Sequence, residues 1–171
     1  MALARRVTES LPLRRALRRV AGTVCIIAAG REGHRCGLTA TSVTSLSLDP
    51  PALLVCINRV SSTYATITRE RRFSVNVLGT DQSTFARIFS ARDVTGEQRF
   101  LSGAWRESVD GVPHLPSANA TMVCSIESEV AFGSHVAVIG RVTEVLMNDD
   151  TAKSPLLYFE GDYRTLLPGG G

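Results

Sequence analysis

The chain has 171 residues, of which 44% are hydrophobic and 20% charged, and this composition excludes a disordered chain. A single core at this length buries enough surface to need neither disulfides nor metals. The net charge of +3 is uneven, because residues 1–20 hold six Arg and one Glu (+5) and the other 151 hold 13 basic and 15 acidic residues (−2), a distribution that argues against a nucleic-acid-binding surface.

The first predicted element is an amphipathic helix with Ser10 as its N-cap, Pro12 in its first turn and its end at Gly22. Its apolar face follows the i, i+3, i+4, i+7 spacing of Leu13, Ala16, Leu17 and Val20. Arg14, Arg15, Arg18 and Arg19 fall on the other face. That face either binds an anionic partner or simply contacts water, and we favour contact with water.

After this helix the pattern changes to short runs rich in Val and Ile, which are typical of β-strands. The runs predict strands over residues 23–29, 52–58, 73–78, 122–130 and 136–147. Between them, residues 64–70 and 85–91 have helical composition, with Ser61 to Thr63 and Asp81 as their respective caps. Many strands with few helices, and no regular alternation of the two, predict a mainly β fold, a barrel or sandwich with inserted helices.

We expect one domain over residues 11–167, with an N-terminal extension over residues 1–10 and a flexible tail over residues 168–171. Residues 93–116 are rich in Gly and Pro and hold the single Trp of the sequence. They predict a long excursion over the barrel surface, which contributes to function or to a subunit contact.

The four cysteines, Cys25, Cys36, Cys56 and Cys124, have neither C-x-x-C pairing nor a His at zinc-finger spacing. This pattern disfavours a metal site, and we interpret them as small buried hydrophobic residues in a reducing compartment. A signal peptide is disfavoured, and no apolar stretch reaches the roughly 20 residues of a membrane span. We therefore expect a cytoplasmic protein.

The most unusual stretch is the hydroxyl-rich segment, residues 37–51 (GLTATSVTSLSLDPP), in which six of the nine residues from Thr39 to Ser47 are Ser or Thr. Hydroxyls on small side chains allow a flat, polar or phosphorylated ligand to approach the backbone closely. An edge strand or a turn has the same composition, so the residues alone leave both interpretations open. Asp49-Pro50-Pro51 ends the segment, since proline cannot donate to a strand ladder.

A second candidate site is the turn from Asn58 to Thr63, between a predicted strand and a predicted helix. The free N–H groups of a helix start, three hydroxyls and the Arg59 guanidinium suit a phosphate group, although an ordinary helix cap has the same sequence. The sequence holds no Walker A motif and no G-x-G-x-x-G motif, so a bound nucleotide would lie outside the common nucleotide-binding folds.

Two further stretches place polar or aromatic groups near predicted strand ends. His135 follows the Gly133-Ser134 turn, where it either contacts a ligand or is an ordinary surface residue. Residues 155–166 hold Tyr158 and Tyr163, which either approach a planar ligand or belong to a closing strand. The three His share no spacing, which gives a His-based metal site or a Ser-His-Asp triad no support.

Taken in this order, the four stretches resemble the short-chain flavin reductase family, the reductase components of two-component flavin-dependent monooxygenases. The resemblance covers residues 13–166. Its most specific parts are residues 37–55, FSVNVL at 73–78, G-S-H-x-x-x-x-G-x-V at 133–142 and the closing P-L-x-Y-x-x-G-x-Y. Two positions depart from the family pattern, because Ser134 stands where many members have Asp and Thr41 where Asn is frequent.

The resemblance implies a mainly β, Greek-key split barrel of the FMN-binding type with a few short helices, assembled as a homodimer. It implies that FMN or FAD binds along the hydroxyl-rich segment and the following turn, with NADH or NADPH stacked at the His135 turn. The implied site residues are Thr39, Ala40, Thr41, Ser42, Val43, Ser47, Leu48 and Asp49 around the isoalloxazine; Asn58, Arg59, Ser61, Ser62 and Thr63 at the ribityl phosphate; Phe89, Ser90 and Arg92 at the far end of the flavin; and His135, with Tyr163 and Arg164, at the nicotinamide.

The activity implied by this resemblance is an NAD(P)H:flavin oxidoreductase, which transfers hydride to the flavin and supplies diffusible reduced flavin to a separate monooxygenase. His135 is the one catalytic candidate, and no metal, nucleic acid or membrane is expected. Two alternatives stay open. One is a flavoprotein oxidase or monooxygenase that holds its flavin tightly, and the other is a non-catalytic module that binds a flavin-like planar ligand.

Overall fold

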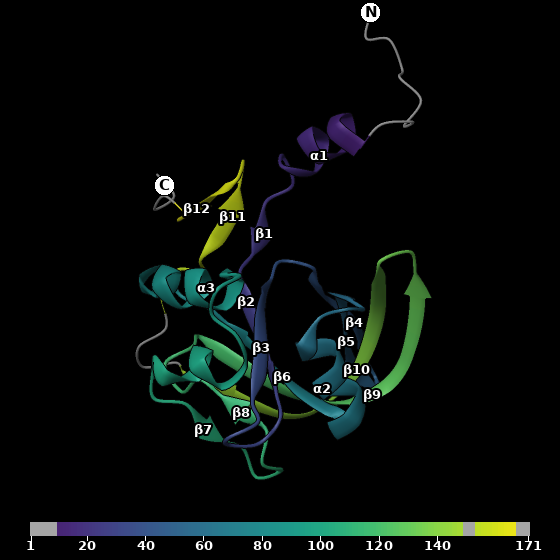
Figure 1. Ribbon diagram of the computed structural model, residues 1–171, viewed down its shortest axis with the longest axis vertical. Coiled ribbons are helices and arrows are strands. Elements are labelled where there is room, and N and C mark those ends of the chain that lie inside the picture. Colours follow the sequence, from purple (N-terminus) through teal and green to yellow (C-terminus); the bar gives the residue numbers. More distant parts are fainter. Residues whose placement is uncertain (1–9, 149–152, 167–171) are drawn as a thin grey trace, which may run out of the picture.

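The computed structural model describes residues 10–148 and 153–166 and shows a mainly β fold with a few short helices (Figure 1). Its main sheet has seven strands in the order β3-β2-β6-β9-β10-β5-β4, and all neighbouring strands are antiparallel. The strands of this sheet are β2 (Cys25–Ala29), β3 (Cys36–Ala40), β4 (Val43–Leu48), β5 (Pro51–Asn58), β6 (Arg72–Val77), β9 (Ala120–Phe132) and β10 (His135–Met147).

Two smaller sheets and the helices complete the fold. One small sheet joins β1 (Gly22–Thr23), β11 (Leu157–Phe159) and β12 (Asp162–Arg164), and the other joins β7 (Arg106–Glu107) and β8 (Pro113–His114). The helices are α1 (Ser10–Leu17), α2 (Ser62–Glu70), α3 (Ser83–Ser90) and the short 3-10 helices η1 (Thr80–Gln82) and η2 (Gly96–Leu101). In Figure 1, α1 and the β1-β11-β12 sheet lie together at one end, while β9 and β10 curve away from α3.

The predicted strands and the two later helices are confirmed, with small shifts of their ends. The hydroxyl-rich segment forms β3 and β4, so it is strand as well as a candidate ligand wall. The predicted tail, residues 168–171, and residues 1–9 of the predicted extension lie outside the described residues. The domain boundaries therefore stay a prediction.

The N-terminal helix is shorter than predicted. It begins at Ser10 and ends at Leu17, because a tighter turn follows in which the N–H groups of Arg19 and Val20 donate to the carbonyls three residues back, and Gly22 then pairs with β11. The arginine side chains of this segment are exposed, as predicted. Its apolar face does not pack against the described part of this chain, since Leu17 is 58% exposed.

The predicted cap of α3 is wrong. Asp81 lies inside η1, and Gln82 occupies the N-cap position of α3 without a capping side-chain hydrogen bond. The short 3-10 helix leads directly into α3, so the chain enters α3 already helical and leaves no extended residue at which an Asp side chain would cap. Ser61, in contrast, caps α2 as predicted, since its side chain accepts a hydrogen bond from the Tyr64 N–H.

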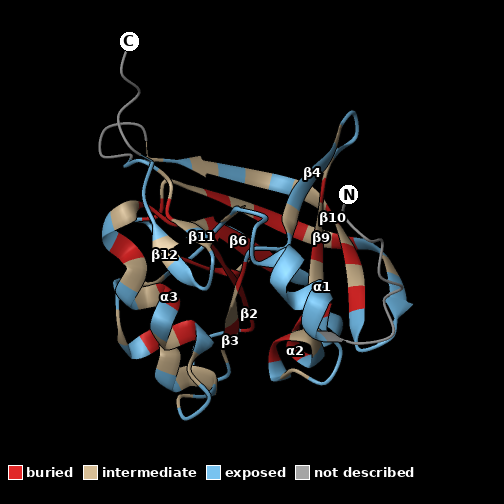
Figure 2. Cartoon of the chain, turned by 90° about the horizontal axis from the view of Figure 1, so that it is seen from above, coloured by how far each residue is buried: buried red, intermediate tan, exposed pale blue. Residues whose placement is uncertain are grey.

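Strand β2 is buried on both faces and divides the core in two. Because side chains alternate along a strand, Ile27 joins one hydrophobic cluster with Ile67 of α2, while Ile26 joins a second with Phe89 of α3. Figure 2 shows buried stretches in β2 and on parts of α2 and α3. The two helices thereby fix the walls on either side of the strand.

The sequence predicted residues 93–116 as an excursion over the surface, but part of this segment is buried in the core. Phe100 and Leu115 are 4% and 1% exposed, and both belong to the cluster around Phe89. The rings of Phe89, Phe100 and Trp105 lie 4.8 to 5.3 Å apart, centroid to centroid. Aromatic side chains scattered in a Gly-rich and Pro-rich stretch have no strand or helix period, which is why the pattern did not reveal their burial.

A buried polar network fastens this segment to the main sheet. The Asn76 side chain, fully buried in β6, donates to the Ile26 carbonyl (3.1 Å) and to the Ser74 hydroxyl (2.9 Å). Its oxygen accepts from the Leu115 N–H (2.8 Å) and the Thr121 hydroxyl (3.0 Å). The amide thus uses two donors and two acceptor positions, which is its full capacity.

Burial makes Cys25 and Cys124 unreactive, and it raises the pKa of both thiols to about 12. The interpretation as buried hydrophobic residues is confirmed for these two, whereas Cys36 and Cys56 are only half-buried.

We expect iodoacetamide at about pH 8 to modify Cys36 and Cys56 before Cys25 and Cys124, because the thiolate is the reactive form. Peptide mass spectrometry measures the order, with urea-unfolded protein as the control in which all four react alike. Because the unfolded state loses these thiol protons from about pH 8.5 and the folded state keeps them to about pH 12, the free energy of unfolding should fall as the pH rises between these values. Early labelling of Cys25 or Cys124 in native protein contradicts this prediction.

Candidate functional site

A cleft of about 850 Å³ lies where β3, the end of β5, the start of α2 and the end of α3 meet. The elements come from distant parts of the sequence, and the antiparallel order of the sheet brings them together. Of the site residues implied by the sequence, the cleft gathers Thr39, Ala40, Thr41, Ser42, Asn58, Ser61, Ser62, Thr63, Phe89, Ser90, Arg92 and His135.

Thr39 to Ser42 form one wall of this cleft, the hydroxyl-rich wall, and hydrogen bonds to α3 and β5 hold it in place. The Thr39 hydroxyl donates to the Ala86 carbonyl of α3 (2.7 Å), and the Ser42 hydroxyl donates to the Cys56 carbonyl of β5 (2.8 Å). These bonds anchor the end of β3 and the following turn on opposite sides. The wall therefore presents small side chains on a fixed backbone, which suits a flat ligand.

The first turn of α2 forms the polar end of the cleft. The Ser61 hydroxyl accepts a hydrogen bond from the Tyr64 N–H (3.1 Å). The N–H groups of Ser62 and Thr63 have no acceptor among the described residues. Thr63 is 1% exposed, and its hydroxyl, on the cleft wall, also bonds to none of the described residues. Free donors at the positive end of a helix form a site for an anionic group such as phosphate.

His135 lies beside this polar end, at the first residue of β10 and opposite Asn58 of β5. The Arg59 N–H donates to the Ser134 carbonyl (3.0 Å), which ties the α2 turn to the hairpin of His135. The Ser134 hydroxyl lies 2.9 Å from Nδ1 of His135. When that hydroxyl donates to Nδ1, the neutral ring carries its proton on Nε2 and presents a donor there.

Several implied site residues do not line the cleft. Leu48 pairs with Pro51, at the end of β5 opposite to Asn58, so Ser47, Leu48 and Asp49 lie far along the edge strand. Val43 pairs with Val55 and packs against the hydrophobic core. The physical reason is antiparallel pairing, which carries β4 away from the cleft after the turn at Ser42.

The remaining three, Arg59, Tyr163 and Arg164, also lie outside the cleft. The Arg59 side chain is exposed, and the Arg164 guanidinium pairs with Asp162 (3.0 Å). Tyr163 lines an adjoining hollow of about 220 Å³, which shares Thr39, Ala40, Thr41 and Ser90 with the cleft. Its ring contacts Tyr158 edge to face, at 5.5 Å between centroids. The closing hairpin thus borders the site without reaching His135.

The cleft also contains residues that the sequence did not indicate. The most notable is Arg99 of η2, and the others are Leu38, Cys56, Ile57, Val60 and Ala91. Arg99 bonds to Gly37, 62 positions earlier in the chain, and no local pattern signals a contact over that separation.

Two negative findings concern residues 10–148 and 153–166. They contain no group of three or more His, Cys, Asp or Glu side chains that would hold a metal ion. No helix in these ranges has the length and apolar character required to cross a membrane.

Comparison with known proteins shows extensive similarity. Residues 17–167 match the profile of the family described as Flavin reductase like domain. The chain is 40% identical over 158 residues to "FMN reductase (NADH) RutF 1" of Methylorubrum extorquens (strain PA1), covering 92% of this chain and 77% of that protein. It is 36% identical over 159 residues to the reductase component of an FADH(2)-dependent resorcinol hydroxylase of Rhizobium sp. (strain MTP-10005), covering 92% and 87%.

A solved structure agrees closely with the fold. The NADH:FAD oxidoreductase SgcE6 of Streptomyces globisporus C-1027, in complex with NAD and FAD fragments, superposes with a TM-score of 0.89. The two sequences are 26% identical, and the superposition covers 99% of this chain and all of the other.

Proposed function

The chain belongs to the flavin reductase-like family, and from that premise we propose that it is an oxidoreductase that reduces FMN or FAD with NADH or NADPH. We further propose that the reduced flavin leaves the protein and serves a separate monooxygenase, as the name of the resorcinol hydroxylase reductase component says of that relative. The observation that carries the proposal is the cleft that joins the hydroxyl-rich wall, the open start of α2 and His135.

The residues of the cleft fit a flavin phosphate. The N–H groups of Ser62 and Thr63 and the Thr63 hydroxyl provide donors without described partners, at the end of a nine-residue helix. Donors of this kind favour a dianionic phosphate over a neutral group. The small residues Ala40 and Ser42 leave room for a planar ring against β3.

A bound flavin supplies the redox chemistry, because its ring accepts a hydride, two electrons and one proton, from the nicotinamide C4. The chain contributes position. Residues of β3 and the turn after it would contact the ring, the start of α2 would bind the phosphate, and His135, which also lines the cleft, would contact the nicotinamide.

His135→Ala should raise the NADH KM or slow turnover modestly, because the electron transfer takes place between the two nucleotides and needs no side-chain acid or base. Stopped-flow absorbance of the flavin band measures the rate of reduction. Ser134→Ala, which keeps the ring and removes its hydrogen-bond partner, is the matched control and should change less. A loss beyond about 10⁴-fold contradicts this role and indicates an essential proton-transfer group.

We also propose that the protein is a homodimer in the cytoplasm. Leu48 of β4 and Phe132 of β9 are 92% and 89% exposed, and apolar side chains this exposed favour coverage by a partner subunit. Light scattering of the purified protein tests the assembly. A monomer at micromolar concentration contradicts it.

Dialysis separates the proposed activity from its main alternative. A reductase that releases its product loses bound flavin during dialysis and regains full activity when FMN or FAD is added back. A tight flavoprotein oxidase or monooxygenase stays yellow. A binding module without catalysis takes up flavin but oxidises no NADH.

A further inference from the structure

Arg99 of η2 bonds to two separate segments of the chain, the start of β3 and the stretch that follows α3. Its Nη1 donates to the Gly37 carbonyl of β3, its Nη2 to the Ala91 carbonyl after α3 (2.7 Å) and its Nε to the Val94 carbonyl (2.8 Å). The planar guanidinium holds its donors in a fixed geometry that spans these three acceptors, whereas a lysine ammonium concentrates its donors on one atom. The wall formed by Ser90, Ala91 and Arg92 is thereby fastened to β3.

The charge of Arg99 has no carboxylate partner among the described residues, unlike that of Arg35 or Arg72. Three carbonyl dipoles accept its hydrogen bonds, and burial lowers its pKa. Three of its five N–H groups are engaged, so two remain for a ligand. Arg99 and Arg92 both line the cleft, so its wall carries two cationic side chains.

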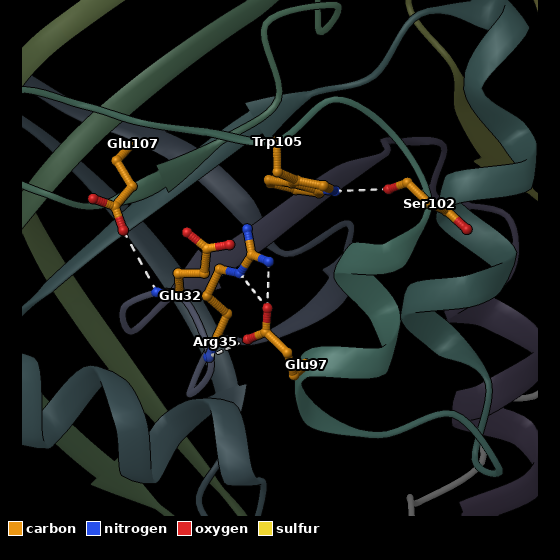
Figure 3. Close-up of polar contacts among 6 residues, drawn as sticks. All are labelled: Glu32, Arg35, Glu97, Ser102, Trp105 and Glu107. Carbon is orange, nitrogen blue, oxygen red and sulfur yellow. Dashed lines mark hydrogen bonds and ion pairs between the residues drawn. The ribbon is translucent and has the colours of Figure 1, made fainter.

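The short helix that carries Arg99 makes a second, separate contact near the start of β3, through Glu97. Glu97 pairs with the Arg35 guanidinium and also accepts a hydrogen bond from the Arg35 N–H at 2.8 Å (Figure 3). The same guanidinium lies 4.8 Å from the centre of the Phe100 ring. Neither Arg35 nor Glu97 lines the cleft. The two contacts of η2 can therefore be weakened independently.

We propose that Arg99 is a positioning residue of the cleft, which holds the Ser90 to Arg92 wall against β3 and places on that wall a positive charge without a carboxylate partner among the described residues. The inference rests on the proposed function and adds to it a cationic group that lies outside the start of α2. Substitution of Arg99 should therefore weaken flavin binding in two ways, by loosening the wall and by removing the positive charge.

Equilibrium binding of FMN and FAD, followed by quenching of flavin fluorescence, tests the inference. Arg99→Lys keeps the charge but loses the fork, and its flavin Kd should rise about tenfold. Arg99→Gln loses both, and its Kd should rise about 100-fold for at least one of the two flavins. At saturating flavin, kcat should stay within about threefold of the unsubstituted protein, since the wall only positions the ring.

Glu97→Gln is the matched control, because it weakens the other contact of η2. Its Kd should change less than about threefold even where its Tm falls as much as that of Arg99→Lys. Guanidinium ion, added at concentrations that leave the protein folded, should restore flavin binding to Arg99→Ala. An unchanged Kd in Arg99→Lys overturns the inference, as does an equal rise in Glu97→Gln. Inactivity of the unsubstituted protein with NADH and flavin overturns the proposed function instead.

Discussion

Replacing Ser62 with Asp should raise the flavin KM by about 100-fold, because a carboxylate about 4 Å from a phosphate costs several kcal/mol at an effective dielectric constant near 20. Ser62 is the first residue of α2, is exposed and lines the cleft. An Asp at a helix start is favourable for the helix itself. The variant should therefore be at least as stable as the original protein while it binds flavin poorly.

The prediction is specific because Ser62→Asp should weaken flavin binding without lowering the stability of the fold. Steady-state kinetics with varied FMN gives the KM, and a thermal melt gives the Tm. Thr84→Asp is the matched control, since Thr84 is exposed in the first turn of α3 and does not line the cleft. It should leave the KM unchanged. An unaltered KM in Ser62→Asp contradicts a phosphate site at the start of α2.

Replacing Asn76 with Ala should lower the free energy of unfolding by about 3 to 5 kcal/mol, because it leaves several buried partners without a hydrogen bond. The groups that lose their hydrogen-bond partner are the Ile26 carbonyl, the Leu115 N–H and the Thr121 hydroxyl, all in the interior. The same change releases Leu115 from the cluster that supports Phe89 on the cleft wall.

Urea unfolding measures this loss. Asn119→Ala provides the comparison, because its side chain bonds to the Lys153 backbone at an exposed position and should contribute less than about 1.5 kcal/mol. Variants at Asn76 should still turn over at low temperature, since Asn76 does not line the cleft. A loss below about 1 kcal/mol contradicts the structural role of the network.

Features that depend on local pattern were predictable from the sequence. The Val-rich and Ile-rich runs predicted the strands, and Ser61 predicted the start of α2. Both features depend on residues that are close together in the sequence. For the hydroxyl-rich segment and the Asn58 to Thr63 turn, the residues alone left a ligand site and ordinary structure both open. The structure brings the first part of that segment and most of the turn to one cleft.

Features that depend on distant contacts were not predictable. Arg99 reaches the cleft because η2 packs beside β3, and its bond partner Gly37 is 62 residues away. Ser47 to Asp49 looked like part of the same wall, yet the register of β4 with β5 carries them to the far end of the strand. Phe100 and Leu115 are buried because they pack in the cluster around Phe89, and the Leu115 N–H bonds to Asn76. The spacing of apolar residues in their own segment does not indicate this burial.

The measurement that tests the central claim most directly is NADH oxidation, followed at the absorbance band of reduced nicotinamide, with flavin present in amounts far below NADH. We expect oxidation that requires added FMN or FAD, continues over many turnovers as oxygen reoxidises the released flavin, and falls in Ser62→Asp. No flavin-dependent oxidation with either NADH or NADPH would contradict the assignment as a flavin reductase.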